Sequence, residues 1–154
     1  MKKINLKELV ETYPISYEAI AYGMEKSRQW VHQLVIKKVI KRPELNRKHI
    51  LNIQNYLQQA GSEMIDVTAN EISLSQFKTW PFSLSALSLY MKKPKFWLSE
   101  GLTNQSLSPD DKVAIALHIN SIGSILHDIV LLDFIQHDDV AKYLTGRNNI
   151  FGIV

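Results

Sequence analysis

The sequence contains no cysteine, which excludes disulfide bonds and metal sites built on thiolates. It also lacks a hydrophobic run long enough to cross a bilayer, because polar residues such as His118 and Asp128 interrupt the most apolar stretch, residues 115–132. Near the N-terminus, lysines occupy positions where a signal peptide needs apolar residues. These absences predict a cytoplasmic protein with no membrane partner.

Motifs of common enzyme and cofactor sites are missing as well. No HExxH, GxSxG, P-loop or dinucleotide-binding fingerprint occurs. A group of histidines and aspartates admits either a metal site or a solvated acidic surface, and the lack of ligand spacing favours the surface; its members are His118, His127, His137, Asp128, Asp133, Asp138 and Asp139. The sequence thus predicts no enzyme, no metal site and no cofactor.

Charge is distributed unevenly along the chain. The net charge is +3, but residues 1–62 carry eleven Lys and Arg against five Asp and Glu, a net of +6. Residues 63–154 carry seven against ten, a net of −3. The basic excess lies between Lys26 and Lys48. This asymmetry indicates either that the first half meets a polyanion or that it has a solvated, lysine-rich face.

The chain repeats itself with an offset of 67 residues. The segment Thr12–Ser16 recurs as Thr79–Ser83, and seven of the 24 positions from residue 12 to residue 35 are identical in both copies. Chance would give about one or two identities at ordinary residue frequencies. The first copy covers residues 4–58 and the second copy covers residues 72–126. Since the period is too long for a solenoid, a duplicated small domain is indicated.

The elements expected within each copy are four short helices. In the first copy we expect Pro14 to end the first helix, Ser16 and Ser27 to cap the next two, and Gly61 to end the fourth. In the second copy the last helix is longer and more apolar, and its aliphatic residues are Val113, Leu117, Ile119, Ile122, Ile125, Leu126 and Ile129.

The expected fold is therefore all-α, with two tandem small helical units that each contain a helix-turn-helix. We expect a DNA-binding unit at residues 1–61, a linker at 62–71, a diverged second unit at 72–135, and a C-terminal helix with an apolar tail at 136–154. A hydrophobic content of 45% supplies enough apolar material for such a core.

Residues 17–34 form the pattern of a helix-turn-helix, whose second helix reads base edges in the major groove. Arginine and glutamine bond guanine and adenine edges. We therefore assign base contacts to Ser27, Arg28, Gln29, His32 and Gln33. Basic side chains neutralise phosphates, and we assign phosphate contacts to Lys26, Lys37, Lys38, Lys41 and Arg42. Candidate contacts from the second copy are Lys92, Lys93 and Lys95. The alternative for all of them is an ordinary exposed surface. For Trp30 and Trp97, core packing is favoured over contact with DNA.

With these residues identified, the sequence resembles the phage-repressor-like (Cro and Xre type) helix-turn-helix family. The resemblance covers most of residues 4–58 and is carried by Leu6–Leu9, Ile15–Ala21 and Ser27–Val31. It implies a lambda-repressor-like fold and specific DNA binding, usually as a symmetric pair.

The sequence also departs from the family pattern. Glu25 stands where a turn glycine is usual, and Lys26 stands where an apolar residue is usual. In the second copy, Ser88, Pro94 and Gly101 replace the small alanine, the capping serine and the core leucine of the first copy. The second copy is therefore the more diverged of the two.

These patterns predict a sequence-specific double-stranded DNA-binding protein and a transcriptional regulator. The alternative is a non-enzymatic protein-interaction or structural module that keeps the fold without binding DNA. Because the second half is acidic, we expect the second copy to act mainly as a scaffold that packs on the first copy or forms a homodimer. Two recognition helices in one chain would alternatively make it a covalent pseudo-dimer.

Overall fold

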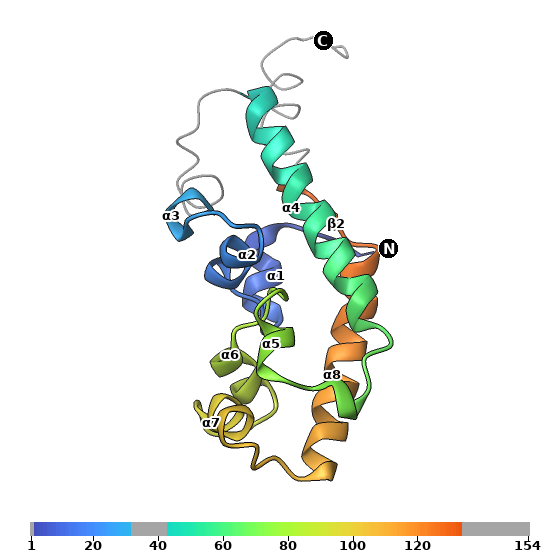
Figure 1. Ribbon diagram of the computed structural model, residues 1–154. Coiled ribbons are helices and arrows are strands. Elements are labelled where there is room, and N and C mark those ends of the chain that lie inside the picture. Colours follow the sequence, from blue (N-terminus) through green and yellow to red (C-terminus); the bar gives the residue numbers. More distant parts are fainter. Residues whose placement is uncertain (1, 32–42, 134–154) are drawn as a thin grey trace.

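The computed structural model describes residues 2–31 and 43–133, and these residues are mostly helical, which confirms the all-α class. Figure 1 shows the elements in space. Their order is β1 (Lys3–Ile4), α1 (Leu6–Thr12), α2 (Tyr17–Gly23), α3 (Arg28–Val31), α4 (Pro43–Met64), the 3-10 helix η2 (Ala69–Glu71), α5 (Leu74–Phe77), α6 (Leu84–Tyr90), α7 (Trp97–Asn104), α8 (Pro109–His127) and β2 (Val130–Leu131).

Helix starts follow from side-chain caps, as the sequence predicts. Ser16 Oγ accepts the Ala19 N–H at 3.0 Å to cap α2, and Ser27 Oγ accepts the Trp30 N–H at 3.1 Å at the start of α3. In the second copy, Ser83 Oγ accepts the Ala86 N–H at 3.2 Å at the start of α6. Each cap satisfies an amide donor that has no partner inside its helix. Helix α1 ends at Thr12, ahead of Pro14, which agrees with the predicted stop.

The two copies meet through bonds exchanged between equivalent residues. The Ser16 N–H donates to the Pro81 carbonyl, and the Ser83 N–H donates to the Pro14 carbonyl, both at 3.2 Å. Ile15 and Phe82 form an isolated antiparallel bridge between these bonds. Ile15 and Phe82 are equivalent residues at the offset of 67, and each serine bonds the proline that is equivalent to the proline of its own copy. The exchange is therefore reciprocal and marks an approximate two-fold axis between the copies.

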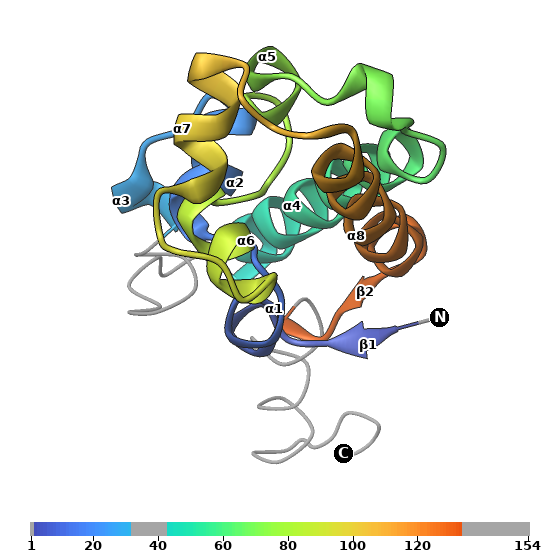
Figure 2. The ribbon, with the colours of Figure 1, turned by 90° about the horizontal axis from the view of Figure 1, so that it is seen from below.

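The long helices α4 and α8 form the most extensive helix–helix contact of the described chain. Figures 1 and 2 show them together on one side of the molecule, with the shorter helices of both copies on the other. Gly61 and Gly123 lie at their crossing, where a Cβ on Gly61 would come 2.8 Å from the Gly123 carbonyl oxygen. The predicted helix end at Gly61 is wrong: α4 continues to Met64, because this glycine serves the close crossing and not a C-cap.

The expected linker also begins inside a helix. Residues 62–64 belong to α4, and Ala69–Glu71 form η2, capped by Thr68 and Glu71. From α8, the Asn120 Nδ2 donates to the carbonyls of Met64 and Val67 at 2.8 and 3.0 Å. The connection is thereby bonded to the second copy.

One apolar core runs through both copies. It includes Ile20 and Val31 of the first copy and their equivalents Leu87 and Leu98 of the second, and all four side chains are fully buried. In α8, Ile119, Ile122 and Leu126 are buried. Val113 and Leu117 of the same helix are 48% and 63% exposed.

The two ends of the described chain lie side by side. Strand β1 pairs with β2 in parallel, with Lys3 opposite Val130 and Ile4 opposite Leu131. Buried Asp133 accepts the Leu6 N–H at 2.6 Å and so holds the start of α1. The predicted C-terminal helix and tail at 136–154 lie outside the described residues.

Candidate nucleic-acid interface

In the first copy, a tight turn joins α2 to α3. Met24 is the C-cap of α2, and Glu25 adopts a left-handed backbone with φ 58°. The Lys26 N–H donates to the Ala21 carbonyl at 2.7 Å. Ala21 is buried, so the chain turns closely over it. This turn places Lys26, Ser27 and Gln29 on the exposed surface.

A lysine–aromatic cluster stands at this turn. The Lys26 Nζ lies 5.5 Å from the centroid of the Trp30 ring, a cation–π distance. The other side of the cluster is His49 of α4, whose ring meets Trp30 edge-on at 5.1 Å. Burial and the positive charges of Lys26 and Lys48 lower the pKa of His49 below its ordinary value. Trp30 is half-buried and packs on the core, which agrees with the packing interpretation.

The structure describes only part of the predicted site. Lys26, Ser27 and Gln29 lie together at the start of α3, where Arg28 is the first helical residue. Ser27 also has a structural role as the α3 cap. The remaining predicted contacts lie outside the described residues: His32, Gln33, Lys37, Lys38, Lys41 and Arg42.

The second copy repeats the cluster at the offset of 67 residues. Lys92 is left-handed with φ 62°, as Glu25 is, and the Lys93 N–H donates to the Ser88 carbonyl at 2.9 Å. The Lys93 Nζ lies 5.2 Å from the Trp97 ring centroid, and the Lys95 Nζ lies 5.5 Å from that of Phe96. Lys92, Lys93 and Lys95 are all exposed.

Ser88 compensates for the proline that opens this region. In the first copy Ser27 caps α3, but its equivalent is Pro94, which has no side-chain acceptor. Helix α7 instead begins at Trp97, and the buried Ser88 Oγ accepts the Leu98 N–H at 3.1 Å while donating to the Leu84 carbonyl at 2.9 Å. The departure from the expected small residue therefore has a structural reason.

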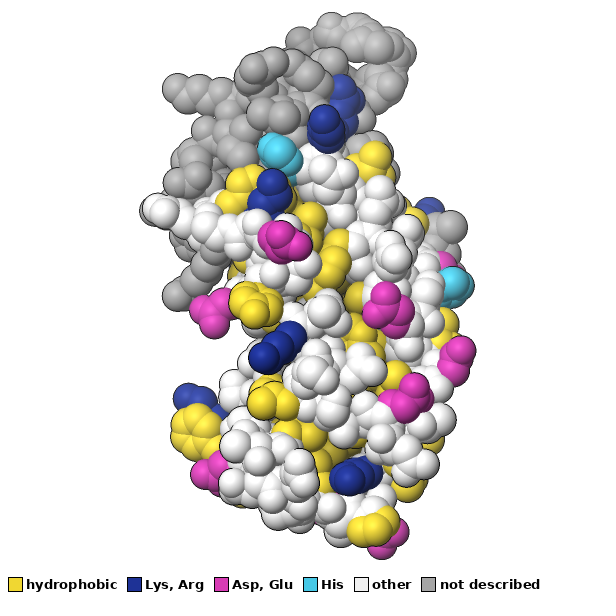
Figure 3. Space-filling model, viewed as in Figure 1, with side chains coloured by type: hydrophobic (Ala, Val, Ile, Leu, Met, Phe, Trp, Pro, Cys, Tyr) yellow, Lys and Arg dark blue, Asp and Glu magenta, His cyan; other side chains and the backbone are white. Residues whose placement is uncertain are grey.

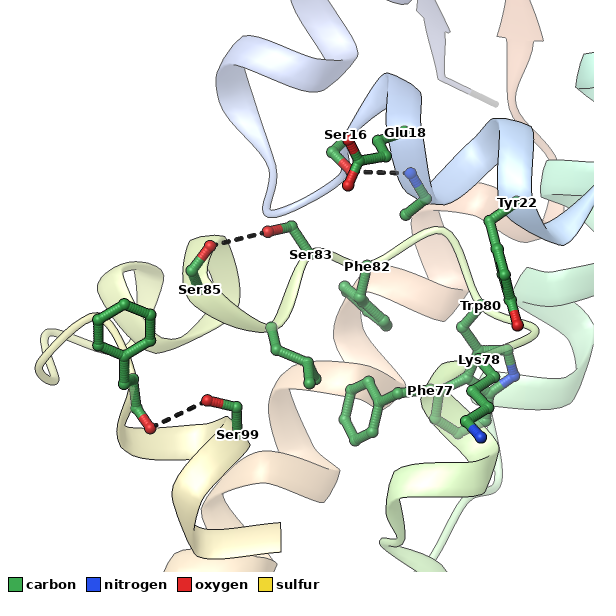
Figure 4. A pocket seen from close by; sticks show the side chains of 13 residues that line it. Ser16, Glu18, Tyr22, Phe77, Lys78, Trp80, Phe82, Ser83, Ser85 and Ser99 are labelled. Atoms are coloured by element: carbon green, nitrogen blue, oxygen red, sulfur yellow. Dashed lines mark hydrogen bonds between the residues drawn. The ribbon is translucent and has the colours of Figure 1, made fainter. Parts of the chain in front are cut away.

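Helices α3 and α7 lie on the same side of the molecule, opposite α4 and α8, in both ribbon views (Figures 1 and 2). Between the two units the surface is hollowed, as the left edge of Figure 3 shows. A cavity of about 450 Å³ opens here, with Tyr22, Phe77, Trp80 and Phe82 among its walls. Figure 4 shows side chains from both copies around it, and Phe96 of the second lysine–aromatic cluster also lines this cavity.

Two residues near the clusters were not predicted from the sequence. His49 is nineteen positions after Trp30, and no local spacing links them. Phe96 is 59% exposed and stands at the position equivalent to Gln29. The internal alignment contained the signal for Phe96, because an offset of 67 leads directly from one residue to the other.

Other kinds of site find less support in the described chain. Within residues 2–31 and 43–133, no three His, Asp or Glu side chains gather closely enough to hold a metal ion. No helix in these ranges combines the length and apolar character that crossing a membrane requires. Comparisons of the chain with family models, with curated proteins and with solved structures find no match.

Proposed function

We propose that this protein binds double-stranded DNA in a sequence-specific manner and acts as a transcriptional regulator. The observation that carries the proposal is the exposed turn between α2 and α3, where Lys26 covers Trp30 and Gln29 faces solvent. The α2–turn–α3 segment is interpreted as a helix-turn-helix, and its counterpart in the second copy as another.

Residue chemistry at this turn suits a duplex. Lysine supplies a mobile cation for phosphate oxygens, and glutamine supplies the paired donor and acceptor that match an adenine edge. Arg28 begins α3 beside Gln29, in the first turn of the helix that would enter the major groove. Glu25 has a left-handed backbone, which glycine adopts more readily than other residues. A glycine is usual at this turn position in the family that the sequence resembles.

The test is binding to a pool of random-sequence 30-bp duplexes, followed by selection of the tightest binders. We expect affinity to fall steeply with salt, because phosphate contacts release counterions. On a selected duplex, Arg28→Ala and Gln29→Ala should each weaken binding about 5- to 150-fold, corresponding to roughly 1–3 kcal/mol for a bidentate base contact. Lys37→Ala or Lys38→Ala should weaken binding to all sequences and flatten its salt dependence.

The outcome that overturns the proposal is equally specific. If the wild-type protein binds no duplex at 50 mM salt, DNA binding is excluded and the protein-interaction module is favoured. If it binds but the Arg28→Ala/Gln29→Ala double variant matches it on every duplex, α3 is not the recognition helix.

A further inference from the structure

Building on the proposed DNA binding, we infer that one chain contacts both half-sites of a duplex, one with each copy. The lysine–aromatic cluster of the second copy contacts a second half-site on the same duplex, and the two half-sites differ in sequence. The ligand is therefore a duplex with an asymmetric pair of half-sites, bound by one chain and not by a homodimer. The second copy is then a DNA-contacting unit as well as a scaffold.

Local charge supports contact by the second copy. Residues 25–29 of the first turn carry one acid and two basic residues, a net of +1, whereas the equivalent residues 92–96 carry three lysines and no acid, a net of +3. The net charge of −3 for the whole second half does not describe the charge near this turn, because charges beyond about 10 Å are largely screened at 0.1 M ionic strength. A phosphate near the turn meets chiefly Lys92, Lys93 and Lys95.

Internal symmetry supplies the geometry that other proteins obtain by dimerising. Dimeric helix-turn-helix proteins place two recognition helices on successive major-groove turns through their two-fold axis. In this chain the exchanged bonds of Ser16 and Ser83 mark such an axis within one polypeptide. The α4–α8 crossing joins the copies on one side of the molecule, and α3 and α7 lie together on the opposite side (Figures 1 and 2).

Different side chains at equivalent positions make the half-sites unequal. Gln29 of the first copy can pair with an adenine edge, whereas its equivalent Phe96 can make only apolar contact, which in the major groove is offered by the thymine methyl group. Phe96 is 59% exposed, with the Lys95 Nζ at 5.5 Å from its ring. We therefore expect a thymine in the second half-site.

The test compares two matched lysine pairs on the full-length protein. Lys92→Asn with Lys93→Gln removes two charges from the second cluster, and asparagine tolerates the left-handed backbone at position 92. Lys2→Gln with Lys3→Gln removes two exposed charges at the N-terminal strand, on the side of α4 and α8. Affinity for a selected duplex is measured against salt, with circular dichroism as a check of folding and light scattering of the complex as a measure of stoichiometry.

We expect the Lys92/Lys93 variant to lose at least about tenfold in affinity at 50 mM salt and to reduce the salt slope by about 1.8, or 0.9 per phosphate. The Lys2/Lys3 variant should stay within about twofold, and the complex should contain one chain per duplex. If the wild type binds DNA but both variants bind equally well, or if two chains occupy each duplex, the inference is overturned while the proposed function stands. A wild type that binds no duplex overturns both.

The thymine contact has its own readout. Replacing single thymines of the selected duplex by deoxyuridine removes only the methyl group. We expect one such replacement in the second half-site to weaken the wild type by about two- to tenfold and to leave Phe96→Ala unaffected. Equal losses in the wild type and Phe96→Ala would overturn the assignment of Phe96.

Discussion

The first copy caps its third helix with Ser27, at the surface, whereas the second copy starts its third helix two positions later and relies on buried Ser88. Around this difference the backbone is nearly the same. Glu25 and Lys92 share a left-handed conformation, and the lysine amide of each turn bonds the carbonyl of the equivalent helical residue. The two copies share a backbone conformation at this turn, while the side chains that they display there differ.

The side chains at the two turns differ both in charge and in polarity. The second copy has three lysines at its turn and presents Phe96 at the position equivalent to the polar Gln29. A matched backbone with unmatched side chains is the arrangement expected of two units that approach the same kind of polyanion but read different bases. Substitutions at equivalent positions can therefore separate what the frame contributes from what each copy contributes.

The largest effect is expected where the copies cross. Gly61→Ala and Gly123→Ala should each destabilise the protein by about 1–3 kcal/mol, because the added methyl meets backbone or Met64 Cβ at under 3 Å. Urea denaturation measures the loss, and Ser124→Ala, at the exposed neighbour in α8, should change stability by less than about 0.5 kcal/mol. In a helix without close neighbours, replacing glycine by alanine stabilises by about 1 kcal/mol. A gain in stability of that size in either variant would show that α4 and α8 are not so closely packed.

The next effect distinguishes the two caps. Ser88→Ala should cost about 1–3 kcal/mol, since it leaves the buried Leu98 N–H without its acceptor. Ser27→Ala removes an exposed cap and should cost about 1 kcal/mol or less. Thermal denaturation of both variants gives the comparison, and an equal or reversed order would contradict the buried cap in the second copy.

A smaller effect is expected at the left-handed positions. Glu25→Gly and Lys92→Gly should each stabilise the protein by up to about 1 kcal/mol, because glycine relieves a conformation costing other residues about 1–2 kcal/mol while losing some chain entropy. Their effects on DNA affinity should differ in sign, since one removes an acid and the other a lysine. Glu25→Gln is the control that changes charge alone. The same sign of affinity change in both glycine variants would count against DNA contact by the second turn.

The smallest effect concerns pH and belongs to the first copy alone. Since burial, Lys26 and Lys48 lower the pKa of His49, the unfolded chain binds more protons between that pKa and the ordinary value of about 6.5. Stability should therefore decline as pH falls below about 6.5 and level off below the folded-state pKa. Denaturation from pH 7.5 to 5 should show this decline in the wild type and in His118→Gln, but less of it in His49→Gln. A pH profile in His49→Gln that matches the wild type would contradict the lowered pKa of His49.

Much of the helical frame could be predicted from the sequence because its signals are local. Ser16 and Ser27 are caps, and Pro14 follows the end of α1. Ile50, Ile53 and Leu57 are buried on one face of α4, as their helical spacing predicts. The repeat in the sequence also predicted that equivalent helices would occur in the same order.

Features that depend on packing between distant segments could not be predicted. Gly61 has the local pattern of a helix end, and only its partner Gly123 in α8 explains why α4 continues. Val113 and Leu117 are apolar residues in an apolar helix, yet α8 meets its neighbours through another face. In the candidate site, the contact of His49 with Trp30 depends on where α4 lies relative to α3. The basic character of the second turn does not show in the net charge of the second half of the chain, which is −3.

The central claim is that both copies of one chain contact one face of a single duplex. Hydroxyl-radical footprinting on a selected duplex tests it most directly, with the wild type and the Lys92→Asn/Lys93→Gln variant side by side. We expect the wild type to protect two patches on one face, about one helical turn or 34–36 Å apart, and the variant to lose one patch while keeping the other. A single protected patch in the wild type, unchanged in the variant, would contradict the claim.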